Sequence, residues 1–263
     1  MTHGLLLFLS VVLIAPAANA VAPALDSLRA QSAAGYEAMP PEPPRPYPAA
    51  ARAPQLSAMA LAAEAVREVR LLGLRSPSEI KMTMDRIRPG SPQAELLPAL
   101  KAQYEASLKD LLALREEFDK EFVWGLSSPG FDHLAGRMRE LAMKYKAGNC
   151  TEQAFLAQAY LRSKGVKASM VVLQTFDWWT MQLDPDKNHV FTVFGLPEGA
   201  NPAIPAQWGP DAVVADPWGR LAGPAQESLR IMLDELFRLD QSHQLPRYSV
   251  LDYEHLTKTR SLP

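Results

Sequence analysis

The sequence of 263 residues contains one cysteine and shows no marked excess of charge of either sign. A single cysteine excludes a disulfide framework within the chain. The 27 Lys and Arg residues are balanced by 29 Asp and Glu residues, which gives a formal net charge of −2. No run of basic residues stands out, so we expect neither a nucleic acid nor an anionic membrane surface as a partner. With 48% hydrophobic residues, the composition is that of an ordinary globular protein.

Basic residues are also missing ahead of the first apolar run. That run covers Leu5 to Ala15, the length of a signal-peptide core and too short to span a bilayer. The motif Ala18-Asn19-Ala20 follows it and has the small-x-small pattern of a cleavage site. We predict a signal peptide over residues 1–20, cleaved after Ala20, and therefore a secreted or periplasmic protein. An uncleaved anchor is the alternative.

Prolines are concentrated in residues 39–54, MPPEPPRPYPAAARAP, where they argue against a helix or a central strand. We predict an Ala/Pro-rich linker over residues 21–54, in the form of a stiff tether. Residues 55–145 then have helical composition and contain no cluster of chemically active side chains. We interpret this helical region as a scaffold or as a binding module. Its expected helices cover residues 56–72, 93–122 and 131–146. Between the first two, a helix is expected to restart at residues 76–79, with Pro at its first position, and to end before Pro89-Gly90.

The pattern changes in residues 146–263. A helix is expected over 151–164, and short apolar runs rich in Val and Phe predict strands at 166–174, 189–195 and 212–219. A further amphipathic helix is expected over 228–239, followed by an irregular end. These elements predict an α+β domain in which one helix precedes a small antiparallel sheet.

The single cysteine, Cys150, lies in the segment Gly-Asn-Cys-Thr-Glu. Gly148 is suited to end one helix, Asn149 to cap the next, and Glu152 to reach back to the cap amide. By itself this pattern favours a structural role for the segment. A helix start also favours the thiolate form of a cysteine, and its unpaired amides can stabilise an oxyanion. The position is therefore half of a site for acyl transfer, without a base.

Two other residues can supply the missing parts. His189 is expected at the start of one strand and Asp216 at the end of the next. His189 lies 39 residues after Cys150, and Asp216 lies 27 residues after His189. Taken singly, a histidine at a strand end or an Asp before a proline is more often structural. A thiol, a base and a carboxylate in this order match a catalytic triad, with Cys150 as the nucleophile. The joint pattern favours catalysis.

The segments Gly-Asn-Cys-Thr-Glu, Asn-His-Val-Phe and Val-Ala-Asp-Pro-Trp resemble the papain-like and transglutaminase-like superfamily of cysteine enzymes. Within it they are most similar to the Cys-His-Asp domain of dermonecrotic-toxin type. The resemblance covers roughly residues 145–220. It implies an α+β, papain-like core with the nucleophile helix packed on a small antiparallel sheet. It also implies Cys150 as nucleophile, His189 as base and Asp216 as the residue that orients the base.

Known enzymes of the toxin branch deamidate a glutamine of a host protein. The resemblance therefore implies a glutamine-bearing protein substrate, a toxin or effector role, and no cofactor or metal. The sequence also departs from relatives, because Thr151 stands where transglutaminases carry a Trp after the nucleophile. A cysteine peptidase, a transglutaminase of the same fold and a non-catalytic effector or binding module remain alternatives. The sequence does not indicate an oligomeric state.

Further side chains could contribute to an oxyanion or substrate site. Trp178 and Trp179 could wall a groove, and Trp218 could shield the triad from water, although packing roles are equally expected of them. The complete set of these secondary candidates is Asn149, Thr151, Gln174, Trp178, Trp179 and Trp218.

Overall fold

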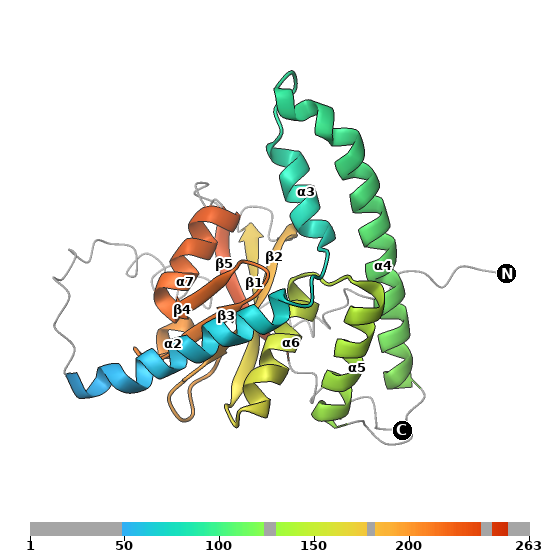
Figure 1. The fold of residues 1–263 in the computed structure, drawn as a ribbon. Helices are drawn as coiled ribbons and strands as arrows, with labels where there is room; N and C mark the ends of the chain where they lie inside the picture. Colours follow the sequence, from blue (N-terminus) through green and yellow to red (C-terminus); the bar gives the residue numbers. More distant parts are fainter. Residues whose placement is uncertain (1–48, 124–129, 178–181, 238–243, 252–263) are drawn as a thin grey trace, which may run out of the picture. The chain divides into compact units, whose positions relative to one another are not determined.

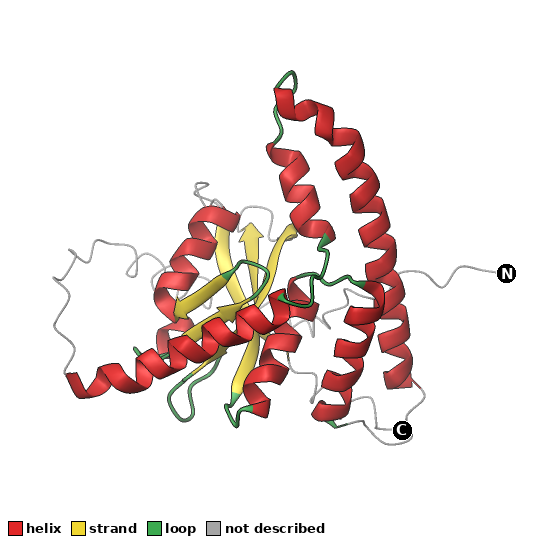
Figure 2. Ribbon diagram, viewed as in Figure 1, coloured by secondary structure: helices red, strands yellow, loops and turns green. Residues whose placement is uncertain are grey.

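The computed structural model describes residues 49–123, 130–177, 182–237 and 244–251, which belong to one compact unit. The predicted signal peptide, residues 21–48 of the predicted linker, and Trp178 and Trp179 lie outside the described residues. The described part is α+β, with a helical region first and a small antiparallel sheet after it (Figures 1 and 2). This confirms the predicted fold class at the level of α+β.

Four α-helices and one 3-10 helix form the first region. They are α2 (Ala49–Arg70), α3 (Pro77–Arg86), η1 (Pro92–Leu96), α4 (Leu97–Val123) and α5 (Phe131–Tyr145). The predicted restart is confirmed, because the Ser76 side chain caps α3 and Pro77 occupies its first position. Helix α2 begins at Ala49, so the last residues of the predicted linker are helical. The alanines of this stretch favour a helix over the extended tether that the prolines indicated.

The second region surrounds a five-stranded antiparallel sheet with the order β4-β3-β2-β1-β5. Its elements are α6 (Cys150–Ser163), β1 (Ala168–Asp177), β2 (Gln182–Phe194), η2 (Pro205–Gln207), β3 (Val213–Asp216), β4 (Leu221–Pro224), α7 (Ala225–Ile231), a π-helix (Met232–Phe237) and β5 (Gln244–Leu251). Strand β2 is central, with His189 opposite Leu173 of β1 and Thr192 opposite Ala215 of β3. The sheet therefore places the segments with His189 and Asp216 on neighbouring strands.

Three predictions for this region were wrong in detail. Strand β2 begins at Gln182, so His189 lies inside the strand and not at its start. The expected irregular end contains β5, whose Pro246 and Arg247 are typical of an edge strand and weaken the strand signal in the sequence. The last helix begins at Ala225, three residues before its predicted start. Pairing in a sheet overrides weak local propensity, which explains the two errors in the strands.

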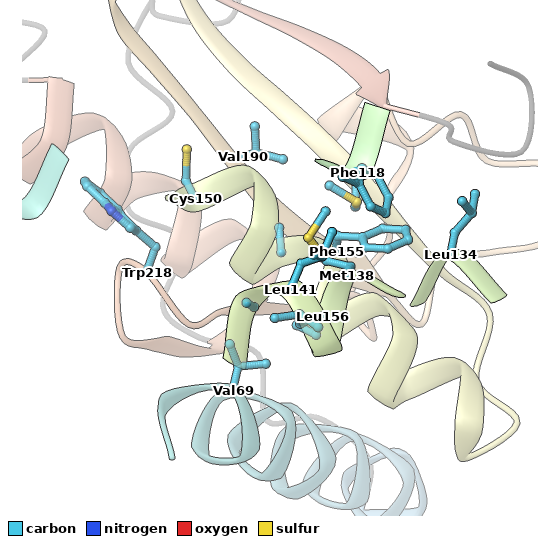
Figure 3. Close-up of a cluster of buried hydrophobic side chains, with 14 of the residues drawn as sticks. Val69, Phe118, Leu134, Met138, Leu141, Cys150, Phe155, Leu156, Val190 and Trp218 are labelled. Atoms are coloured by element: carbon cyan, nitrogen blue, oxygen red, sulfur yellow. The ribbon is translucent and has the colours of Figure 1, made fainter. Parts of the chain in front are cut away.

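Alternate residues of the strands pack against different helices, as expected for a covered sheet. Met170 and Val190 belong to one cluster with Phe155 of α6, and Figure 3 shows Cys150 and Trp218 in the same cluster. Val171 and the residues that alternate with it pack instead against α7. Helix α2 contacts α6, β3 and β4, so the helical region and the sheet share one core (Figure 1). The predicted domain boundary at residue 145 falls inside this unit.

None of the described helices has the length and hydropathy required to cross a membrane.

Candidate active site

The turn before α6 holds Cys150 in place. The predicted capping box forms, and the Asn149 amide donates to Oε2 of Glu152 at 2.9 Å. The Gly148 amide donates to the carbonyl of Arg75 at 3.1 Å, and the Gln153 side chain donates to the Gly148 carbonyl at 2.9 Å. Cys150 is the first residue of the helix, and 9% of it is exposed. The thiol therefore lies at the positive end of the α6 dipole, on an anchored turn.

His189 and Asp216 form a buried pair across β2 and β3. The Nε2 atom of His189 lies 2.7 Å from Oδ2 of Asp216, and the two side chains are 2% and 0% exposed. The other carboxylate oxygen, Oδ1, accepts a hydrogen bond from the Gly219 amide at 3.0 Å. Both carboxylate oxygens are thus engaged, which fixes the carboxylate and, through Nε2, the orientation of the imidazole ring.

The protonation state of His189 follows from its surroundings. Burial of the ring lowers the pKa of His189, but the charge of Asp216 and its hydrogen bond raise it, and Cys150 raises it further. The net effect raises the pKa of His189 from 6.5 to about 10. The ring is therefore an imidazolium at neutral pH, with Asp216 on one side and Cys150 close enough to act on its charge.

The second ring nitrogen of His189 is available to the thiol. The Nδ1 atom is buried and has no hydrogen-bond partner among the described residues. Cys150 nevertheless raises the pKa of His189 through its hydrogen-bonding and charge interactions, so the thiol lies beside the ring in a contact looser than the bond to Asp216. Such loose contacts are common in unliganded catalytic sites and tighten when substrate binds. The three residues that the sequence singled out therefore lie together.

The secondary candidates have different surroundings. The Trp218 ring packs on the His189 ring, with centroids 4.9 Å apart, and its indole nitrogen donates to Oγ of Ser76 at 2.8 Å. Asn149 uses its side-chain oxygen to accept hydrogen bonds from the Ser76 hydroxyl and the Ser78 amide. That oxygen is therefore shared between the start of α3 and the capping box of α6.

The two remaining candidates for the oxyanion or substrate site, Thr151 and Gln174, have no contact in the described part of the chain that assigns them a role there. Thr151 is half-buried in the first turn of α6, and Gln174 is half-buried on β1 opposite Asn188. Among the described residues, no three His, Cys, Asp or Glu side chains are arranged to hold a metal ion.

Two residues near the triad were missed in the sequence. Ser76 was expected only at the restart of a helix, and its contacts to the site come from residues 73 and 142 positions away. Gly219 follows Asp216-Pro-Trp and reads as an ordinary turn glycine. Only the structure places its amide on the Asp216 carboxylate.

Comparisons with known proteins identify no relative. A scan against protein-family models, a search of curated proteins and a search of solved structures each gave no match.

The variant Gly219→Ala is expected to break the His189–Asp216 bond without altering either residue. A Cβ at this position would overlap Oδ2 of Asp216, the oxygen that contacts His189. The carboxylate must then move, and the pKa of His189 should fall from about 10 toward 6.5. The pKa can be followed by NMR titration of the His189 ring proton.

The matched control for this prediction is Gly223→Ala on the adjacent strand. There a Cβ would meet Oγ of Ser228 at 3.6 Å, an ordinary contact. The control should leave the titration of His189 unchanged. Equal titration curves for the two variants would show that the Gly219 contact does not position Asp216.

Proposed function

We propose that the protein is a secreted or periplasmic thiol amidohydrolase that deamidates a glutamine side chain of a protein substrate. The observation that carries the proposal is the buried His189–Asp216 pair beside a cysteine at a helix start. These groups supply a nucleophile, a proton carrier and an orienting carboxylate, which together are the parts of an acyl-transfer triad. The packing of α6 on a small antiparallel sheet supports a papain-like or transglutaminase-like core.

The chemistry would proceed in two steps. In the first, the Cys150 thiolate attacks the side-chain amide carbon, an S–C bond forms, and the first-turn amides of α6 stabilise the oxyanion. His189 gives its proton to the leaving nitrogen, the C–N bond breaks and ammonia departs. In the second step, water gives a proton to His189 and adds to the thioester carbon. The C–S bond breaks to release a glutamate side chain and restore the thiolate. Asp216 holds the ring orientation in both steps.

The limited exposure of the nucleophile supports a side-chain amide as the substrate group. Cys150 is 9% exposed and His189 is 2% exposed, so little room surrounds the thiol. A primary amide at the end of a flexible glutamine side chain can reach such a thiol more easily than a peptide bond in a folded backbone. The choice of glutamine itself comes from the resemblance described above, together with the proposed toxin or effector role.

The proposed activity can be tested with β-casein and a blocked glutaminyl-glycine dipeptide as substrates. We expect the mature protein to convert glutamine to glutamate with release of ammonia, detected by peptide mass spectrometry and an ammonia assay. Cys150→Ala should produce neither signal. New peptide ends would indicate a peptidase, and incorporation of an added amine would indicate a transglutaminase. No product with any substrate would favour a non-catalytic module.

A further inference from the structure

The hydroxyl group of Ser76 connects the helical region to both halves of the candidate active site. It accepts hydrogen bonds from the Trp218 indole nitrogen at 2.8 Å and from the Glu79 amide at 3.2 Å. It donates to Oδ1 of Asn149 at 2.8 Å. A hydroxyl has one donor and two acceptor positions, so every hydrogen-bonding position of Ser76 is used. The residue is 2% exposed, so water cannot readily replace these bonds.

Two of these partners adjoin the proposed catalytic residues. Asn149 is the cap of α6 and immediately precedes Cys150. Trp218 follows Asp216 by two residues and packs on the His189 ring. The Ser76 hydroxyl therefore links the start of α6, which carries Cys150, to the segment that carries Asp216 and Trp218. The Trp218 ring in turn covers His189. A shift of the Ser76 hydroxyl would be transmitted to both segments.

A second contact from the helical region supports the same connection. Arg115 of α4 donates to both carboxylate oxygens of Glu152, at 2.8 and 3.2 Å. The Glu152 side chain is 3% exposed, and its Oε2 atom also accepts a hydrogen bond from the Asn149 amide. The segment from Ser76 through α4, residues 76–123, which we call the helical arm, therefore contacts the capping box of α6 from two directions. Paired hydrogen bonds between Arg and a carboxylate fix geometry as well as charge.

We propose that Ser76 is a positioning residue that keeps Cys150 aligned with His189, and that the helical arm acts on the reactivity of Cys150 through it. The effect on turnover rests on the function proposed above. The structural link does not, because it consists of hydrogen bonds that exist without any substrate. The arm is then part of the active site's support and not only a scaffold or a surface for partners.

The test compares Ser76→Ala with Ser76→Thr and with the control Thr83→Val. Thr83 lies on α3, the helix that Ser76 caps; it is exposed, and its hydroxyl donates locally to the Glu79 carbonyl. Two quantities are measured on folded protein, with folding checked by circular dichroism. The first is the rate of Cys150 alkylation by iodoacetamide from about pH 5 to about pH 11, a range that includes both the ordinary histidine pKa and the pKa of about 10 of His189. The second is the NMR signal of the Trp218 indole proton and its change with His189 protonation.

Trp218→Phe removes the same hydrogen bond from its other end while leaving the cap of α3 intact. If Ser76 acts through Trp218, the double variant should be little slower than Ser76→Ala alone. This comparison separates the link to the site from the simple loss of a helix cap, which would affect stability but not show this lack of additivity.

We expect Ser76→Ala to slow alkylation by about tenfold, which is the whole advantage expected for native Cys150 over an ordinary thiol. Ser76→Thr should restore most of the rate and the indole signal, and Thr83→Val should match the wild type. Unchanged alkylation in Ser76→Ala, with a reactive wild type, would overturn this inference and leave the proposed function standing. If wild-type Cys150 is itself unreactive, the proposed function fails. In that case the NMR measurement decides. If the Trp218 indole signal of Ser76→Ala no longer changes with His189 protonation, the link is supported, and if it changes as in the wild type, the link is refuted.

Discussion

Replacement of His189 by Asn is expected to reduce amide turnover on the order of 10⁴-fold or more, as removal of the base does in known catalytic triads. The side chain of His189 is the proposed proton carrier for both the thiol and the leaving nitrogen. An Asn at this position keeps a polar group near Asp216 but carries no titratable proton. Turnover is measured with the glutaminyl substrate by ammonia release.

The matched control for this prediction is His133→Asn. His133 is exposed on α5 and does not belong to the site. Its replacement should leave turnover within a factor of about two, as is usual for surface substitutions. Similar activity in wild type and His189→Asn would show that His189 is a structural histidine, the alternative that the sequence left open.

The free energy of unfolding is expected to fall as the pH rises above neutrality, because His189 binds its proton more tightly in the folded state. The pKa of His189 is about 10 in the folded protein, against 6.5 for an ordinary histidine. The stabilisation from the charged ring is therefore complete below pH 6.5 and is lost progressively as the pH rises to about 10. Its size should be on the order of a few kcal/mol, since one pKa unit corresponds to about 1.4 kcal/mol.

Asp216→Asn tests the cause of this pH dependence in urea unfolding at several pH values. Loss of the Asp216 charge should lower the pKa of His189 and flatten the decline in stability above neutrality. Asp234→Asn is the control, because Asp234 is exposed and pairs with Arg230 four residues earlier, away from His189 in the sequence. Parallel pH profiles for wild type and Asp216→Asn would contradict the assignment of the raised pKa to this pair. Turnover should also fall sharply in Asp216→Asn, since the ring loses the group that orients it.

The local features of the site were predictable because their residues are neighbours in the sequence. Asn149 and Glu152 are three positions apart, so the capping box could be identified from the sequence alone. The order of Cys150, His189 and Asp216 also indicated that they could meet once a helix and two strands were assigned. The structure places them together even though His189 lies inside β2 and not at its start.

The missed features depend on contacts between distant segments. Ser76 lies at the helix restart that the sequence predicted, but its bond to Trp218 joins residues 142 positions apart. No local pattern encodes such a contact. The strand β5 contains a proline and an arginine, and it is a strand because it pairs with β1. The sequence could therefore predict the elements that carry the candidate site, but not the contacts of the helical arm with them.

The central claim is that Cys150 is an activated thiol beside His189, and iodoacetamide labelling tests it most directly. Cys150 is the only cysteine of the chain, so every label reports on this residue. The measurement compares the labelling rate of the native protein with that of the same protein unfolded in urea, at pH 7 in both cases. We predict that the native protein reacts faster, by about tenfold, because an ordinary thiol is only a few per cent ionised at this pH. Labelling that occurs only after unfolding would contradict the claim and identify Cys150 as a buried structural residue.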